Sequence, residues 1–105
     1  MSYGAEPDVD LLRRTALELE SLERSPPEPI ILGLAEFSGR LGCSLPEVAA
    51  ALARLADLRL IEGPGELDEA WLFRRITNRG HVFLAEVRSQ ARWDEIKLLY
   101  QDQMR

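Results

Sequence analysis

The sequence predicts a single domain that is mainly α-helical with a small antiparallel β-wing. In several segments apolar residues recur every three or four positions, which is the spacing of one face of a helix. A glycine followed by a helix-capping sequence marks a corner between two of these segments, and a Gly-Pro-Gly turn separates two stretches that favour strands. The chain has 105 residues, 46% of them hydrophobic, which is enough for one core. We expect a flexible N-terminus over residues 1–8 and one folded domain over residues 9–105.

The first helix is predicted from Val9 to about Arg24. Asp8 has the side chain of an N-cap, and the proline-rich run over residues 25–29 stops the helix and forms a stiff connector. The apolar stripe of this helix consists of Leu11, Leu12, Thr15, Ala16, Leu19 and Leu22. Charged residues, among them Arg13 and Arg14, fall largely outside the stripe.

Two further helices are predicted to meet at a tight corner. The first has the stripe Ile30, Leu34, Phe37 and Leu41, and Gly42 is the natural residue for its left-handed C-terminal cap. The second starts at Ser44, which with Glu47 forms a capping box, and its stripe is Leu45, Val48, Leu52, Leu55 and Leu58. Two amphipathic helices joined in this way form a helix-turn-helix.

The residues after this corner predict the wing and two closing helices. A short strand begins at about Leu58, residues 63–65 form a turn, and residues 71–77 return as the second strand. Thr77 is a predicted N-cap for a helix with His81, Phe83, Leu84 and Val87, and a last helix runs from about Ala91 with Trp93 inward. These two helices could be separate or one bent helix. The whole order is that of a winged helix-turn-helix, and the broad apolar stripes of the first and last helices predict a homodimer.

Two segments resemble known winged-helix proteins. Residues 34–62 resemble the general winged-helix pattern of bacterial regulators. Residues 76–88, followed by Trp93, are similar to a small bacterial and phage-borne winged-helix family of unknown function, whose signature is Leu/Ile-Thr-x-x-Gly-His-x-Phe-Leu before a tryptophan-bearing helix. The aspartate-containing helix start over residues 9–13 is similar as well. The resemblance covers most of the chain, departs from it at the connector over residues 25–29 and at the acidic wing, and implies a fold but no ligand and no catalytic residues.

The candidate DNA-contacting residues are arginines. The helix over residues 45–58 is the one that would read the major groove, and its predicted outward positions are Glu47, Ala50, Ala51, Arg54 and Asp57. Only Arg54 among them is well suited to base edges. The other arginines that could join a basic patch are Arg74, Arg75, Arg79 and Arg40. Alternatively, they pair with neighbouring acids as solvated surface charges.

The charge of the chain is unfavourable for DNA binding. The net charge is -5, and the wing carries Glu62, Glu66, Asp68 and Glu69, which would repel phosphates. Two functions therefore stay open. The first is a DNA-binding transcriptional regulator of phage or prophage type that binds double-stranded DNA as a dimer. The second is a winged-helix module that does not bind DNA and recognises a protein through its alanine-rich face, Ala50 and Ala51, or through an exposed Trp71, while Trp93 lies in the core or a dimer interface.

The sequence predicts neither an enzyme nor a cofactor. His81 is the only histidine and Cys43 the only cysteine, so neither a catalytic triad nor a zinc site can be assembled from the usual residues. We expect His81 to be a structural hydrogen-bonding residue near the last helix and Cys43 a small buried turn residue, although a redox role is conceivable at a helix start. Residues 63–65 lack the spacing and the lysine of a phosphate-binding loop. No membrane span or secretory signal is recognisable, so we expect a cytoplasmic protein.

Overall fold

The computed structural model describes residues 8–26 and 28–103, so most of the predicted flexible N-terminus lies outside the described residues. The described chain is mainly helical with small antiparallel sheets, as predicted. Its helices are α1 (Val9–Leu22), α2 (Leu34–Leu41), α3 (Leu45–Asp57), α4 (Asn78–Val87) and α5 (Gln90–Gln103). Its strands are β1 (Ile30–Gly33), β2 (Ile61–Glu62), β3 (Gly65–Leu67), β4 (Ala70–Phe73) and β5 (Arg75–Ile76). The two closing helices are therefore separate.

The helix starts that the sequence predicted are formed by the expected caps. The Asp8 carboxylate accepts a hydrogen bond from the Leu11 N–H at 2.8 Å, and the Thr77 hydroxyl oxygen accepts one from the Gly80 N–H at 3.0 Å. The capping box of α3 is complete: the Ser44 N–H donates to Glu47 at 2.9 Å, and the Glu47 N–H donates back to the Ser44 Oγ at 3.2 Å. Gly42 ends α2 with a φ of 69°, which favours glycine.

The sheet is larger than the predicted two-stranded wing. Its strand order is β1-β4-β3, all antiparallel, with Ile30 opposite Phe73 and Gly65 opposite Leu72. The prediction of a helix from Ile30 was wrong, because residues 30–33 form β1 and the helix begins only at Leu34. The adjacent β-branched residues Ile30 and Ile31 follow Pro29, a context that favours extended backbone. A second, two-stranded sheet pairs β2 with β5.

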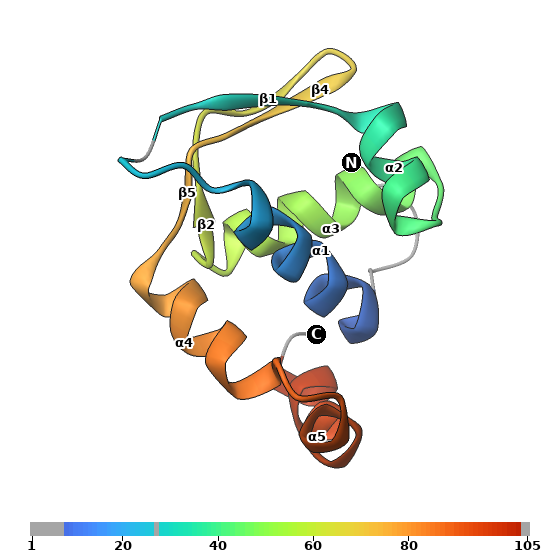
Figure 1. Ribbon diagram of the computed structural model, residues 1–105. Helices are drawn as coiled ribbons and strands as arrows, with labels where there is room; N and C mark the ends of the chain where they lie inside the picture. Colours follow the sequence, from blue (N-terminus) through green and yellow to red (C-terminus); the bar gives the residue numbers. More distant parts are fainter. Residues whose placement is uncertain (1–7, 27, 104–105) are drawn as a thin grey trace.

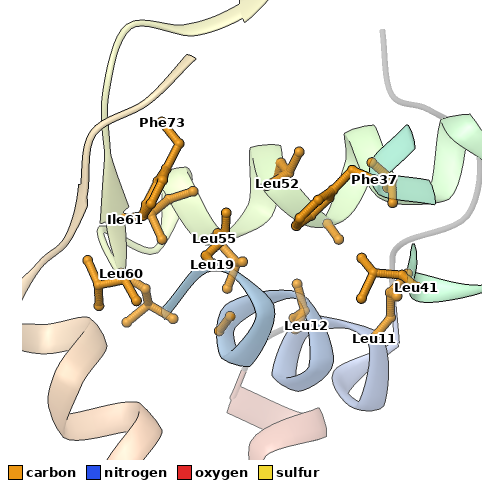
Figure 2. Packing of buried hydrophobic residues seen from close by; sticks show 14 of the residues in the cluster. Leu11, Leu12, Leu19, Phe37, Leu41, Leu52, Leu55, Leu60, Ile61 and Phe73 are labelled. Carbon is orange, nitrogen blue, oxygen red and sulfur yellow. The ribbon is translucent and has the colours of Figure 1, made fainter. Parts of the chain in front are cut away.

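The core lies between α1, α2, α3 and the sheet. In Figure 1, α1 and α3 cross the middle of the molecule, the three-stranded sheet covers one side, and α4 and α5 lie on the other. Figure 2 shows labelled side chains that meet between these elements: Leu11, Leu12 and Leu19 of α1, Phe37 and Leu41 of α2, Leu52 and Leu55 of α3, Ile61 of β2 and Phe73 of β4. Apolar side chains from five elements thus share one core.

Polar side chains of α1 attach the last two helices. Arg13, only 9% exposed, donates hydrogen bonds to the carbonyl oxygens of Val87 at 2.6 Å and Arg88 at 3.1 Å, where α4 ends. The Trp93 Nε1–H donates to Asp10 at 2.6 Å, and its indole ring is fully buried. The sequence placed Arg13 outside the apolar stripe, whereas the structure buries it as the cap of a helix C-terminus.

Candidate interaction surface

An open cleft of about 720 Å³ lies between the end of α3, the turn before β3 and the start of α4. It is lined by Ala56, Asp57, Arg59, Ile61, Glu62, Gly63, Pro64, Gly65, Trp71, Thr77 and Arg79. The exposed side of α3 and the β3–β4 hairpin lie next to it. We refer to the cleft together with Glu47, Asp57 and the hairpin residues 65–70 as the α3–hairpin surface.

Backbone geometry fixes the walls of the cleft. Arg59 has a left-handed backbone, with a φ of 62°, and its carbonyl oxygen accepts a hydrogen bond from the Thr77 hydroxyl at 2.7 Å. Gly63 has a φ of 154°, and a Cβ there would lie 2.6 Å from the Leu72 carbonyl oxygen. The turn therefore requires glycine and lies directly against β4. The Thr77–Arg59 hydrogen bond therefore joins the end of α3 to the start of α4, and the Gly63 turn packs against β4, so these segments form the walls of the cleft.

The α3–hairpin surface is acidic. Six carboxylate side chains on it belong to exposed residues, namely Glu47, Asp57, Glu62, Glu66, Asp68 and Glu69, and they outnumber its two exposed arginines, Arg59 and Arg79. Arg54, on α3, is half-buried and takes part in an interaction within the chain. The Ser44 backbone N–H, which hydrogen-bonds the Glu47 carboxylate, lowers the pKa of that group, so Glu47 stays ionised at neutral pH.

The predicted DNA-contacting arginines do not form one patch. Arg40 lies on α2 and forms an ion pair with Glu18 of α1, at the opposite end of the molecule from β5 (Figure 1). Arg75 forms a two-pronged pair with Glu62, at 2.8 and 3.3 Å, as the surface-charge alternative predicted. Arg74 is exposed beside the Gly63-Pro64 turn, and only Arg79 reaches the cleft.

Sequence reasoning missed Arg59 as a second arginine of the cleft. Arg59 follows the end of α3 and lines the cleft together with Arg79. The sequence predicted that a strand begins in this segment. It gave no sign of the left-handed backbone at Arg59 that directs the Arg59 side chain into the cleft. The pairing of Thr77 with the Arg59 carbonyl is a contact between positions 18 residues apart, which periodicity does not reveal.

Two of the proposed protein-contacting residues are buried, contrary to prediction. Ala51 is 0% exposed and Ala50 half-buried, because α3 is covered by α1 and α2 on one side and by the sheet near its hairpin end. Trp71, expected to be an exposed aromatic, is 6% exposed, since β1 lies beside β4 and places Leu32 opposite it. Trp93 is in the core of the single chain, which was one of its two predicted positions.

His81 and Cys43 have surroundings that do not resemble reactive sites. His81 is exposed on α4, and its Nε2 lies 3.4 Å from a carboxylate oxygen of Glu23, the C-cap residue of α1. Partial burial and the nearby Glu47 raise the pKa of the Cys43 thiol, which opposes formation of the thiolate. Within residues 8–26 and 28–103, no three histidine, cysteine or acidic side chains are grouped to hold a metal ion.

Known proteins offer no counterpart with which this surface can be compared. No family model, curated protein or solved structure matches the chain. Among the described helices, none is both long and apolar enough to cross a membrane.

Proposed function

We propose that the protein is a winged-helix interaction module that recognises a protein partner through its α3–hairpin surface and has no catalytic role. The fold part of the proposal is supported by the order of elements. A helix and a strand precede the α2–α3 corner, and the β3–β4 hairpin follows it and pairs with that first strand. In a winged helix the third helix and the hairpin form the contact surface.

The observation that carries the proposal is the charge of this surface. DNA binding depends on basic side chains that neutralise phosphates, and each acidic side chain that faces the DNA backbone weakens the binding. Here five exposed carboxylates lie on α3 or on the hairpin beside it, a sixth, Glu62, is paired with Arg75, and Arg54 of α3 is half-buried. An acidic surface instead favours a partner that presents lysine or arginine.

The cleft adds an apolar element to this recognition. Ile61, Pro64 and the small exposed part of Trp71 line it, next to the Asp57 carboxylate. A partner segment with one apolar side chain and a basic residue on the side of Asp57, but none on the side of Arg59 and Arg79, matches these features, because the apolar group is desolvated in the cleft while opposite charges pair at the rim.

A DNA-binding regulator, acting as a dimer, is the second candidate. It is favoured by the arginines around the Gly63-Pro64 turn: Arg59 and Arg79 line the cleft, and Arg74 lies exposed beside that turn. Three phosphate contacts per chain would give weak binding that falls steeply with salt unless a dimer doubled them.

The two candidates are separated by fluorescence anisotropy with labelled mixed-sequence duplex DNA in about 50 to 200 mM salt. We expect no binding by the wild-type protein at any salt in this range. The double charge reversal Asp57→Lys/Glu69→Lys should bind this DNA more tightly than wild type at the low-salt end, because it cancels the excess of carboxylates over arginines on the same surface. Wild-type binding that weakens with salt and disappears in Arg59→Ala/Arg74→Ala/Arg79→Ala would replace the proposal with the second candidate.

Protein recognition is tested by a photoreactive amino acid placed at position 57 in cells that make the protein. We expect a cross-linked protein of discrete mass from position 57. The matched control is position 95 on α5, where Glu95 is also an exposed acidic residue, and it should give none. Equal cross-linking from both positions would contradict a specific α3–hairpin surface.

A further inference from the structure

The strand β1 has an open edge. The sheet order β1-β4-β3 places β1 at one end, and within residues 8–26 and 28–103 no strand pairs with its other side. A groove of about 240 Å³ follows this edge and is lined by all four residues of β1 together with Leu22, Arg24, Glu36, Phe37 and Arg40. An open edge is a template on which another strand can pair.

Backbone alternation identifies the groups at this edge. The Leu34 N–H donates to the Glu69 carbonyl oxygen at 2.9 Å, one step beyond the pair Gly33 and Ala70. In an antiparallel pair, hydrogen-bonded and non-hydrogen-bonded positions alternate, so Ile30, Leu32 and Leu34 point their backbone groups toward β4. The N–H and C=O of Ile31 and the N–H of Gly33 therefore point to the open edge.

The side chains of β1 itself are apolar. Ile31 is 73% exposed, lies opposite Leu72, and shares the outer face of the sheet with Leu67, which is 54% exposed. β1 holds no charged residue that would discourage pairing. Exposed isoleucine on an open, uncharged edge is the combination that edge strands of monomeric proteins usually avoid.

We propose that β1 pairs antiparallel with β1 of a second copy of this chain, which joins the two three-stranded sheets into one of six strands. With Ile31 opposite Ile31 of the second copy, each Ile31 N–H donates to the Ile31 carbonyl oxygen across the two-fold axis. Each Gly33 N–H then faces the Pro29 carbonyl oxygen of the second copy. Pro29 has no N–H to satisfy, and the Gly33 carbonyl is already at the N-cap of α2. All edge groups are thus matched by the strand's own sequence.

Charge complementarity favours a second copy over an unrelated strand. The start of β1 is flanked by the ion pair Arg24–Glu28, and its end by Glu36 and Arg40. Arg24, Glu36 and Arg40 line the groove. Antiparallel pairing brings the start of one strand beside the end of the other, so a segment with one acid and one base meets another with one acid and one base, and no excess of like charge opposes the contact. The molecule carries a net charge of -5 and its α3–hairpin surface is acidic, so this charge-balanced edge is where two copies approach at least cost.

Gly33→Pro is the sharpest variant for the test. The backbone of Gly33 has a φ of -67°, which proline adopts without strain, and a Cβ there has no neighbour nearer than 3.9 Å. The substitution therefore removes the edge N–H and leaves the pairing with β4 intact. Gly33→Ala, which keeps the N–H, is the matched control. Leu98→Lys, at a 70% exposed leucine of α5, reports on association through the last helix.

Sedimentation velocity over about 1 to 200 µM protein measures the association, since dimer populations depend on concentration. We expect a dimer for wild type, Gly33→Ala and Leu98→Lys, and a dimer weakened about 10-fold or more for Gly33→Pro, which loses two backbone hydrogen bonds. Amide exchange should slow with concentration at Ile31 and Gly33 but not at Leu32. A wild-type monomer throughout, equal association of Gly33→Pro and Gly33→Ala, or a loss of association in Leu98→Lys alone would each overturn the proposal. So would exchange at Ile31 that is independent of concentration.

Discussion

Replacing Arg13 by methionine should destabilise the protein strongly, although Arg13 looks like a surface residue in the sequence. Its guanidinium donates to the Val87 carbonyl at 2.6 Å, to the Arg88 carbonyl at 3.1 Å and to the Gln90 side chain at 3.1 Å. It also lies 5.8 Å from the centre of the Trp93 ring. Methionine keeps the apolar stem and loses every one of these interactions.

The expected loss follows from the contacts. Three hydrogen bonds at about 1 kcal/mol each, with a cation–π contact of about 0.5 to 1 kcal/mol, give about 3.5 to 4 kcal/mol. The substitution also leaves the Val87 carbonyl at the end of α4 without this donor. Because a buried acceptor without a partner retains its full desolvation cost, we do not expect the loss of stability to fall below this range. This is a large part of the roughly 5 to 15 kcal/mol by which domains of ordinary size are stable.

Urea unfolding followed by tryptophan fluorescence measures this loss, since Trp71 and Trp93 are both buried. The control is Arg92→Met on α5, an exposed position where a change within about 0.5 kcal/mol is expected. A decrease of less than about 1 kcal/mol for Arg13→Met would refute the assignment of Arg13 as the cap that holds α4 to α1.

Two further predictions concern glycine and pH. Gly80→Ala should destabilise by about 2 kcal/mol or more, because the new Cβ would lie 2.1 Å from the Leu60 carbonyl oxygen. Gly39→Ala, with no atom within 4 Å, should stabilise by about 0.5 to 1 kcal/mol; equal effects in urea unfolding would contradict this. The Arg88 guanidinium, hydrogen-bonded at 2.8 Å, lowers the pKa of Glu20 below the ordinary 4.5. This stabilisation is therefore present above that value and lost as pH falls through the folded-state pKa, so Arg88→Gln should flatten the acid side of the stability profile, and an unchanged profile would count against it.

Local patterns in the sequence predicted the helices well because their signals are local. The Ser44–Glu47 box, the Asp8 and Thr77 caps and the Gly42 turn each depend on residues within four positions of one another, and all four are formed. The stripe that included Ile30 was misleading, because its spacing from Leu34 fits a helix as well as it fits a strand that ends just before one. What decides between them is the pairing of β1 with β4, some 40 residues later, which periodicity does not record.

The candidate surface was predictable only in part, for the same reason. Its acidity could be read from Glu66, Asp68 and Glu69, but the burial of Trp71 depends on β1, which the sequence did not reveal. Burial of Ala51 depends on α3 being covered on two sides. The arginines were ranked by residue type alone, whereas their roles are set by the partners that folding brings to them, such as Glu62 beside Arg75.

The attachment of α1 to the last two helices has a consequence for how the protein is made in the cell. Arg13 binds Val87, 74 positions later, and Asp10 binds Trp93, 83 positions later. A ribosome therefore releases the first helix long before the residues that complete its surroundings exist. Until then, part of its apolar face and its buried arginine have no native partner, and such exposed surface is what chaperones hold. Assembly of this small domain is in this sense a late event, because the surroundings of α1 are complete only after α4 and α5 have been made.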